Sequence, residues 1–96
     1  MKAIMVITDS EAMREFVRVL IGEGHHGFTV MPAVAGSGRH GLKTGDRVHP
    51  GSSSLLLTIV AEQDLASMLG LLRRARSEAA GAEAARIWSF SVDEVA

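Results

Sequence analysis

Two short apolar runs constrain the fold of this chain more than any other feature. Ile4–Ile7 lies near the start, and Leu55–Val60, interrupted only by Thr58, lies in the second half. Short apolar runs rich in β-branched residues are typical of buried strands. A strand that is apolar at successive positions has two apolar faces, which favours a central place in a sheet. The sequence therefore predicts two central strands, at 2–8 and 53–61.

Each of these strands is followed by a helical pattern. Thr8 and Glu11 have the spacing of a capping box, and the apolar face of a first helix follows at Met13, Phe16, Val17, Leu20 and Ile21. Gly22 and Gly24 are expected to end that helix. A second helix is expected to begin within 62–64 and to continue to about residue 79.

Two further strands complete the pattern. One is predicted at 28–35, where Pro32 favours a sheet edge, and the other at 86–92, where apolar and polar residues alternate. The resulting order β-α-β-β-α-β predicts a single α+β domain over 1–96 with a ferredoxin-like fold and a four-stranded antiparallel sheet. In that fold the strands at 2–8 and 53–61 are central and the other two are edges.

The helices of such a fold cover one face of the sheet, and the second face here is also apolar. In a chain of 96 residues that is 47% hydrophobic, we expect this face to be buried against other copies of the chain.

Composition excludes several classes of function. A net charge of −1 and 4% aromatic residues argue against a nucleic-acid-binding surface, and the absence of cysteine excludes disulfides and thiol chemistry. The apolar run at the start is too short to insert into a membrane, so a cytoplasmic protein is expected.

The segment from Gly36 to Gly51 is the candidate binding loop. Its glycines leave room for backbone N–H groups to approach a ligand, and its positive charges suit an anion such as phosphate; they are Arg39, Lys43 and Arg47. The alternative is a turn that needs glycine for its geometry alone.

Several segments together resemble the PII signal-transduction superfamily. Gly27-Phe28-Thr29-Val30 followed by Gly36-Ser37-Gly38-Arg39 is similar to the family's G-x-T-V…G-x-G-R-Q segment, although His40 replaces the glutamine. Ala85-Arg86-Ile87-Trp88-Ser89-Phe90 resembles its last strand, of the type G-K-I-F-V-F. The loop at 42–51 is shorter than the family's effector-binding loop, and the chain contains no tyrosine.

This resemblance implies a non-enzymatic regulatory homotrimer that binds an adenine nucleotide, or another small anion, in clefts between subunits. It also implies a protein partner such as an enzyme or a transporter. Carried over by position, it implies that Thr29 lies near the adenine and that the phosphate cleft includes Gly36, Ser37, Gly38, Arg39 and Arg86.

Two alternatives remain open at this point. A metal-responsive trimer, similar to the divalent-cation-tolerance proteins, would use His40 and His49. An enzyme resembling acylphosphatase shares only the topology, and the chain has no Asn for its reaction, so we assign no catalytic residue. We interpret Arg73, Arg74 and Arg76 as a solvated group that complements a helix C-terminus rather than as a phosphate site.

Overall fold

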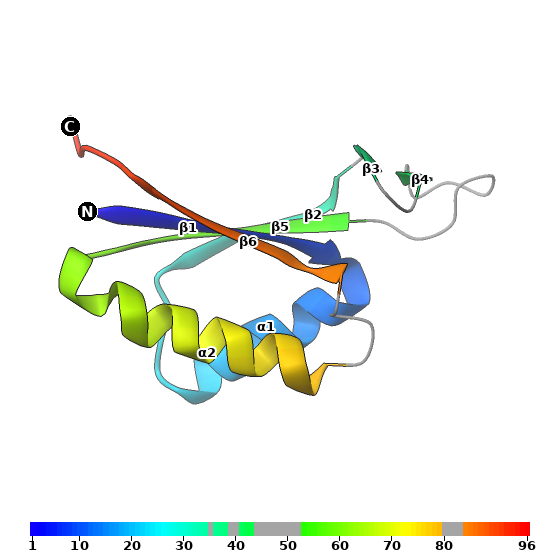
Figure 1. Ribbon diagram of the computed structural model, residues 1–96, viewed down its shortest axis with the longest axis horizontal. Coiled ribbons are helices and arrows are strands. Elements are labelled where there is room, and N and C mark those ends of the chain that lie inside the picture. Colours follow the sequence, from blue (N-terminus) through cyan, green and yellow to red (C-terminus); the bar gives the residue numbers. More distant parts are fainter. Residues whose placement is uncertain (35, 39–40, 44–52, 80–83) are drawn as a thin grey trace.

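The computed structural model describes residues 1–34, 36–38, 41–43, 53–79 and 84–96. These described residues form six strands, two α-helices and one 3₁₀ turn, arranged as in Figure 1. In chain order they are β1 (Lys2–Asp9), α1 (Ser10–Gly22), β2 (Phe28–Val34), β3 (Gly36–Gly38), β4 (Gly41–Lys43), β5 (Ser53–Val60), η1 (Glu62–Asp64), α2 (Leu65–Glu78) and β6 (Arg86–Ser91).

The main sheet has four antiparallel strands in the order β2-β5-β1-β6. β1 and β5 are central and β2 and β6 are edges, so the predicted α+β topology and strand positions are confirmed. The β1–β5 pairing runs from Lys2 opposite Val60 to Asp9 opposite Ser53. The alternation of side chains along this register places every second residue of each strand on the same face.

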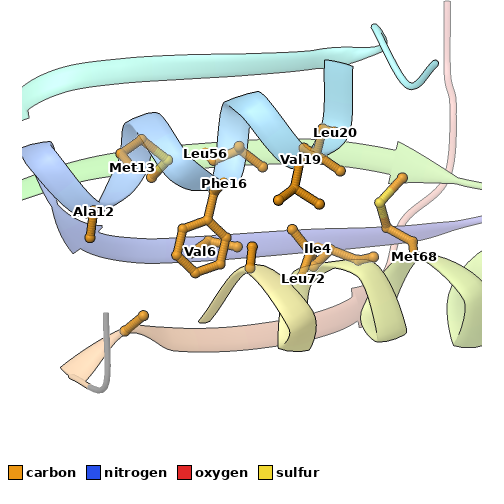
Figure 2. Close-up of a cluster of buried hydrophobic side chains, with 12 residues drawn as sticks. Ile4, Val6, Ala12, Met13, Phe16, Val19, Leu20, Leu56, Met68 and Leu72 are labelled. Carbon is orange, nitrogen blue, oxygen red and sulfur yellow. The ribbon is translucent and has the colours of Figure 1, made fainter. Parts of the chain in front are cut away.

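Both helices lie on one face of the sheet, as Figure 1 shows. The core between them is assembled from alternate strand residues and from one side of each helix (Figure 2). Phe16 of α1 and Leu72 of α2 are fully buried there, together with Ile4, Val6 and Leu56 of the sheet. No helix in the described part of the chain is long and apolar enough to cross a membrane.

The end of α1 follows the expected glycine signal. Gly24 adopts φ 83°, its N–H donates to the Ile21 carbonyl at 3.0 Å, and the His25 N–H donates to the Leu20 carbonyl at 2.8 Å. This pair of hydrogen bonds is the Schellman arrangement, which needs a residue in the left-handed region at the position of Gly24.

The prediction of a capping box at the start of α1 is wrong. Thr8 and Asp9 continue the pairing of β1 with β5, α1 begins at Ser10, and no side-chain hydrogen bond caps it. The helix start is instead joined to the sheet by the Ser10 and Ser54 hydroxyls, which lie 2.9 Å apart. Strand pairing therefore continues up to the helix and leaves no room for Thr8 to cap it.

The predicted loop after β2 contains a short hairpin. β3 and β4 pair as a two-stranded antiparallel sheet, with Gly36 opposite Lys43 and Gly38 opposite Gly41. The sequence gives no strand signal here because glycine, which forms half of the two strands, carries no side chain to alternate.

The face of the sheet opposite the helices is apolar, as expected. It carries Met5, Ile7, Leu55 and Leu57 from the central strands, all partly buried by their neighbours. Near the margins the exposed fractions rise to 48% for Met31 and Ile59, 45% for Trp88 and 44% for Phe90. We call this surface the open face, and Figure 1 shows that neither helix covers it.

Candidate functional site

Two of the predicted site residues, Thr29 and Arg86, lie on opposite edges of the main sheet. Thr29 lies on edge strand β2, opposite Leu57 of β5, and is exposed on the open face. Arg86 begins the other edge strand, β6, opposite Ile7 of β1, and is also exposed. Arg39 lies outside the described residues, as do His40 and His49.

A single copy of the chain does not bring Thr29 and Arg86 together. The register links Thr29 through Leu57 and Met5 to Trp88, two residues beyond Arg86. With strands about 4.8 Å apart and a rise of about 3.4 Å per residue, their Cα atoms are separated by about 16 Å across an apolar surface. Thr29 and Arg86 can therefore lie closer together than this separation only if each comes from a different copy of the chain.

The glycine segment and Arg86 lie at the same end of the sheet. Gly36, Ser37 and Gly38 form β3, just beyond the end of β2, and β6 begins at that end (Figure 1). The backbone of β3 is thus placed near the sheet end where Arg86 stands, whereas Thr29 lies farther back along β2.

Arg86 also belongs to a groove that the sequence analysis did not predict. The groove has a volume of about 340 Å³ and lies between α2 and the edge strand β6. It is lined by Leu69, Arg73, Arg76, Ala85, Arg86, Ile87, Trp88 and Ser89. The available signal was the spacing of Arg73 and Arg76, which places both on one face of a helix but does not indicate which strand they approach.

The three arginines of α2 separate into two environments. Arg74 points toward α1, where its guanidinium lies 3.1 Å from a carboxylate oxygen of Glu23, and it also lies 3.9 Å from Glu78 of its own helix. Arg73 and Arg76 instead line the groove beside β6. Arg73 and Arg74 are exposed to solvent, as the sequence predicts for this group, and Arg76 is partly buried.

One surface ion pair perturbs the titration of its members. The Arg18 guanidinium donates hydrogen bonds to the Glu15 carboxylate, and these lower the pKa of Glu15 below its usual range. The same hydrogen bonds raise the pKa of Arg18. Both residues belong to α1 and neither lines the groove, so the pair stabilises the helix.

The described residues offer no metal centre. Among them, no group of three His, Cys, Asp or Glu side chains could hold a metal ion. His25 and His26 follow the end of α1 and line a separate hollow of about 200 Å³ with Phe28 and Thr58. The Thr58 hydroxyl donates to the Gly27 carbonyl at 2.7 Å, which ties this turn to the central strand β5.

Comparison with known proteins agrees with this architecture. Among solved structures, the chain is similar to CPII, described as a nitrogen regulatory PII-like protein from Thiomonas intermedia K12, bound to ADP, AMP and bicarbonate. The two share 17% sequence identity with a TM-score of 0.63, over 95% of this chain and 86% of that one. Among curated proteins, no relative matches the chain. The sequence pattern described as nitrogen regulatory protein P-II matches residues 1–96, and the chain therefore belongs to the P-II family.

Proposed function

We propose that this chain is a cytoplasmic, non-enzymatic regulatory protein that binds an adenine nucleotide between neighbouring subunits of a homotrimer. The observation that carries the proposal is the separation of Thr29 and Arg86 on opposite edges of one sheet. Membership of the P-II family supports the regulatory role. The ADP and AMP bound by the CPII structure support the class of ligand.

The open face supplies a physical reason for assembly. Trp88, Phe90, Ile59 and Met31 each expose more than two fifths of their surface there. Removing apolar surface from water contributes about 25 cal/mol per Å², and exposed apolar patches of this kind mark interaction sites. Packing of three open faces would place edge strand β2 of one copy near edge strand β6 of the next.

In this arrangement the two halves of the site come from different copies. Thr29 of one copy would contact the base, while β3 and Arg86 of its neighbour would bind the phosphates. Guanidinium groups and glycine backbone N–H groups are both suited to phosphate oxygens. A protein partner, an enzyme or a transporter, would then sense the occupancy of this end of the sheet.

The proposal is tested by measuring mass and ligand binding on the same preparation. Light scattering should give the mass of three chains. Thermal unfolding should show a saturable rise in Tm with ATP, ADP or AMP, because a ligand that binds only the folded protein stabilises it. The rise should disappear in Arg86→Ala and persist in Arg74→Ala, an exposed arginine outside the groove.

Three results would contradict the proposal. A monomer that binds nucleotide, or a trimer whose Tm responds to no adenine nucleotide, would each reject it. A response to Zn²⁺ or Cu²⁺ alone, lost when His40 and His49 are replaced by Ala, would replace it with the metal-responsive alternative.

A further inference from the structure

A second groove lies between α1 and edge strand β2, at the sheet edge opposite to β6. Its volume of about 490 Å³ is in the range of small-molecule sites, and neither Thr29 nor Arg86 lines it. We call it the α1–β2 groove. Phe28 and Val30 line it and pack against the hydrophobic core, so it lies on the helix-covered side of the sheet (Figure 1). Packing of open faces, which lie on the other side, does not by itself cover it.

Most of the lining of the α1–β2 groove is apolar. The five apolar members of its eight lining residues are Met13, Val17, Phe28, Val30 and Pro32. On α1 they are four positions apart and on β2 two positions apart, which are the spacings that place side chains on one face of a helix or a strand. From Ser10 to Val17 the groove follows α1 for about 10 Å, at a rise of about 1.5 Å per residue. Its length and lining suit an extended apolar chain.

The polar lining residues gather at one end of the α1–β2 groove. They are Ser10 and Arg14 of α1 and Ser54 of β5. The Ser10 and Ser54 hydroxyls lie 2.9 Å apart, and Ser54 is buried. Arg14 follows Ser10 by one helical turn, so its guanidinium belongs to the same end as the two hydroxyls. A serine hydroxyl rotates to suit its partner, which makes this end compatible with an anionic group.

Arg14 provides the charge of this end. Among the described residues of α1, Arg18 pairs with Glu15, whereas no ion pair involves Arg14. The eight lining residues include no Asp or Glu. A guanidinium beside an apolar wall is less screened than one in water, and it holds a carboxylate through two parallel hydrogen bonds. One cation and a mainly apolar lining match a ligand with a single negative charge and an apolar body.

We propose that the α1–β2 groove binds a medium-chain fatty acid. Its carboxylate contacts Arg14 beside the Ser10 and Ser54 hydroxyls, and its alkyl chain lies along β2. Removal of the chain from water supplies most of the affinity, and the carboxylate fixes the direction in which the ligand lies. This inference goes beyond the proposed function and is independent of it, because the two sites share no named residue.

Octanoate is the probe, titrated into the full chain by calorimetry at constant ionic strength and below its micellar concentration. We expect saturable binding with one site per chain. Acetate has no alkyl chain to bury, and octylamine carries the opposite charge. Both should bind at least about tenfold more weakly than octanoate.

Arg14→Gln tests the charge and keeps a side chain of high helix propensity. The affinity for octanoate should fall about threefold to tenfold, between the effects of an exposed ion pair and of a charge-assisted hydrogen bond. Arg18→Gln is the matched control, because Arg18 is exposed on the same helix and does not line the groove; it should change the affinity less than about twofold. Arg14→Glu should reverse the preference, so that octylamine binds more tightly than octanoate. Circular dichroism and Tm without ligand establish that each variant is folded.

Methyl NMR signals locate the bound chain, since an alkyl chain also has affinity for the apolar open face. Octanoate in the groove should shift the methyl signals of Val17 and Val30 and leave those of Met31 and Ile59 unchanged. The single tryptophan, Trp88, lies on the open face, so its fluorescence should stay constant.

Four results would overturn the inference. They are the absence of saturable octanoate binding, equal affinity of wild type and Arg14→Gln, equal affinity for octanoate and octylamine, and shifts confined to Met31 and Ile59 with a change in Trp88 fluorescence. A nucleotide titration of the same preparation tests the proposed function separately, because either ligand can bind without the other.

Discussion

The separation of Thr29 and Arg86 leads to a prediction about mixed trimers. Thr29→Phe would block the base with a bulky residue that strands tolerate, and Arg86→Ala would remove a phosphate ligand. Each variant alone should lose nucleotide binding. If the two residues of a site come from neighbouring copies, a mixture of the two variants should regain it.

The expected recovery follows from symmetry. Each cleft of a mixed trimer needs an intact Thr29 from one copy and an intact Arg86 from the next. Random mixing in equal amounts gives about one quarter intact clefts if the site is shared between copies and none if both residues of a site belong to the same chain. The separation of about 16 Å within one chain, across strands about 4.8 Å apart, is the reason for expecting the shared arrangement.

The assay is a nucleotide titration by calorimetry after unfolding the two variants together in denaturant and refolding them. The number of sites per chain should rise from near zero to about one quarter, with wild-type affinity at the recovered sites. As a control, wild-type chains would be mixed with chains that carry both Thr29→Phe and Arg86→Ala. About one quarter of the sites should then be intact if each site is shared between copies, and about one half if each site lies within one chain. Mass spectrometry would verify mixing, and mixed trimers without recovered sites would refute the reasoning.

Three predictions concern stability and can be measured by urea unfolding. Gly24 and Gly70 both have open space where a Cβ atom would be, but only Gly24 has a positive φ. Gly24→Ala should therefore destabilise the fold by about 1–2 kcal/mol. Gly70→Ala should stabilise it by about 0.5–1 kcal/mol, because alanine has a higher helix propensity than glycine. Changes of the opposite sign in the free energy of unfolding would show that backbone conformation does not determine the effect of these two substitutions. Phe16 is fully buried, and Phe16→Ala should cost about 3–5 kcal/mol; a loss below about 1 kcal/mol would mean that the core collapses around the cavity. Since the pKa of Glu15 is lowered in the folded state by Arg18, the ionised carboxylate stabilises the fold at neutral pH, and this stabilisation is lost as pH falls through the folded pKa. Glu15→Gln should therefore be slightly less stable than wild type at pH 7 and equal to it in acid, and a difference that grows in acid would contradict the assignment.

The strands were predictable because their signals are local and redundant. The apolar residues of β1 and β5 require two covered faces, and the register of β1 pairs Val6 with Leu56 on the helix-covered side and Met5 with Leu57 on the open face. A shift by one residue would exchange the two sets, so hydrophobic burial fixes the pairing. The edge position of β2 was likewise predictable from Pro32.

The errors arise where local signals compete or are missing. Thr8 has the spacing of a capping residue, but its pairing with Ser54 keeps it in the strand. The β3–β4 hairpin has too few side chains to show an alternating pattern. The groove beside Arg73 and Arg76 was not predicted because helical spacing alone does not show which strand lies next to them.

The candidate site is harder to predict than the fold because Thr29 and Arg86 lie on opposite edge strands and, in the proposed trimer, would meet only between copies. Edge strand β6 borders both the open face and the groove beside α2, since Trp88 lies on that face and also lines that groove. A change at Trp88 should therefore alter the apolar surface that is proposed to be buried against another copy. If the nucleotide binds between copies as proposed, it should strengthen assembly to the same extent that assembly strengthens nucleotide binding. The order of strands thus places Arg86, the proposed phosphate ligand, and the exposed apolar side chains of Trp88 and Phe90 on the same edge strand, β6.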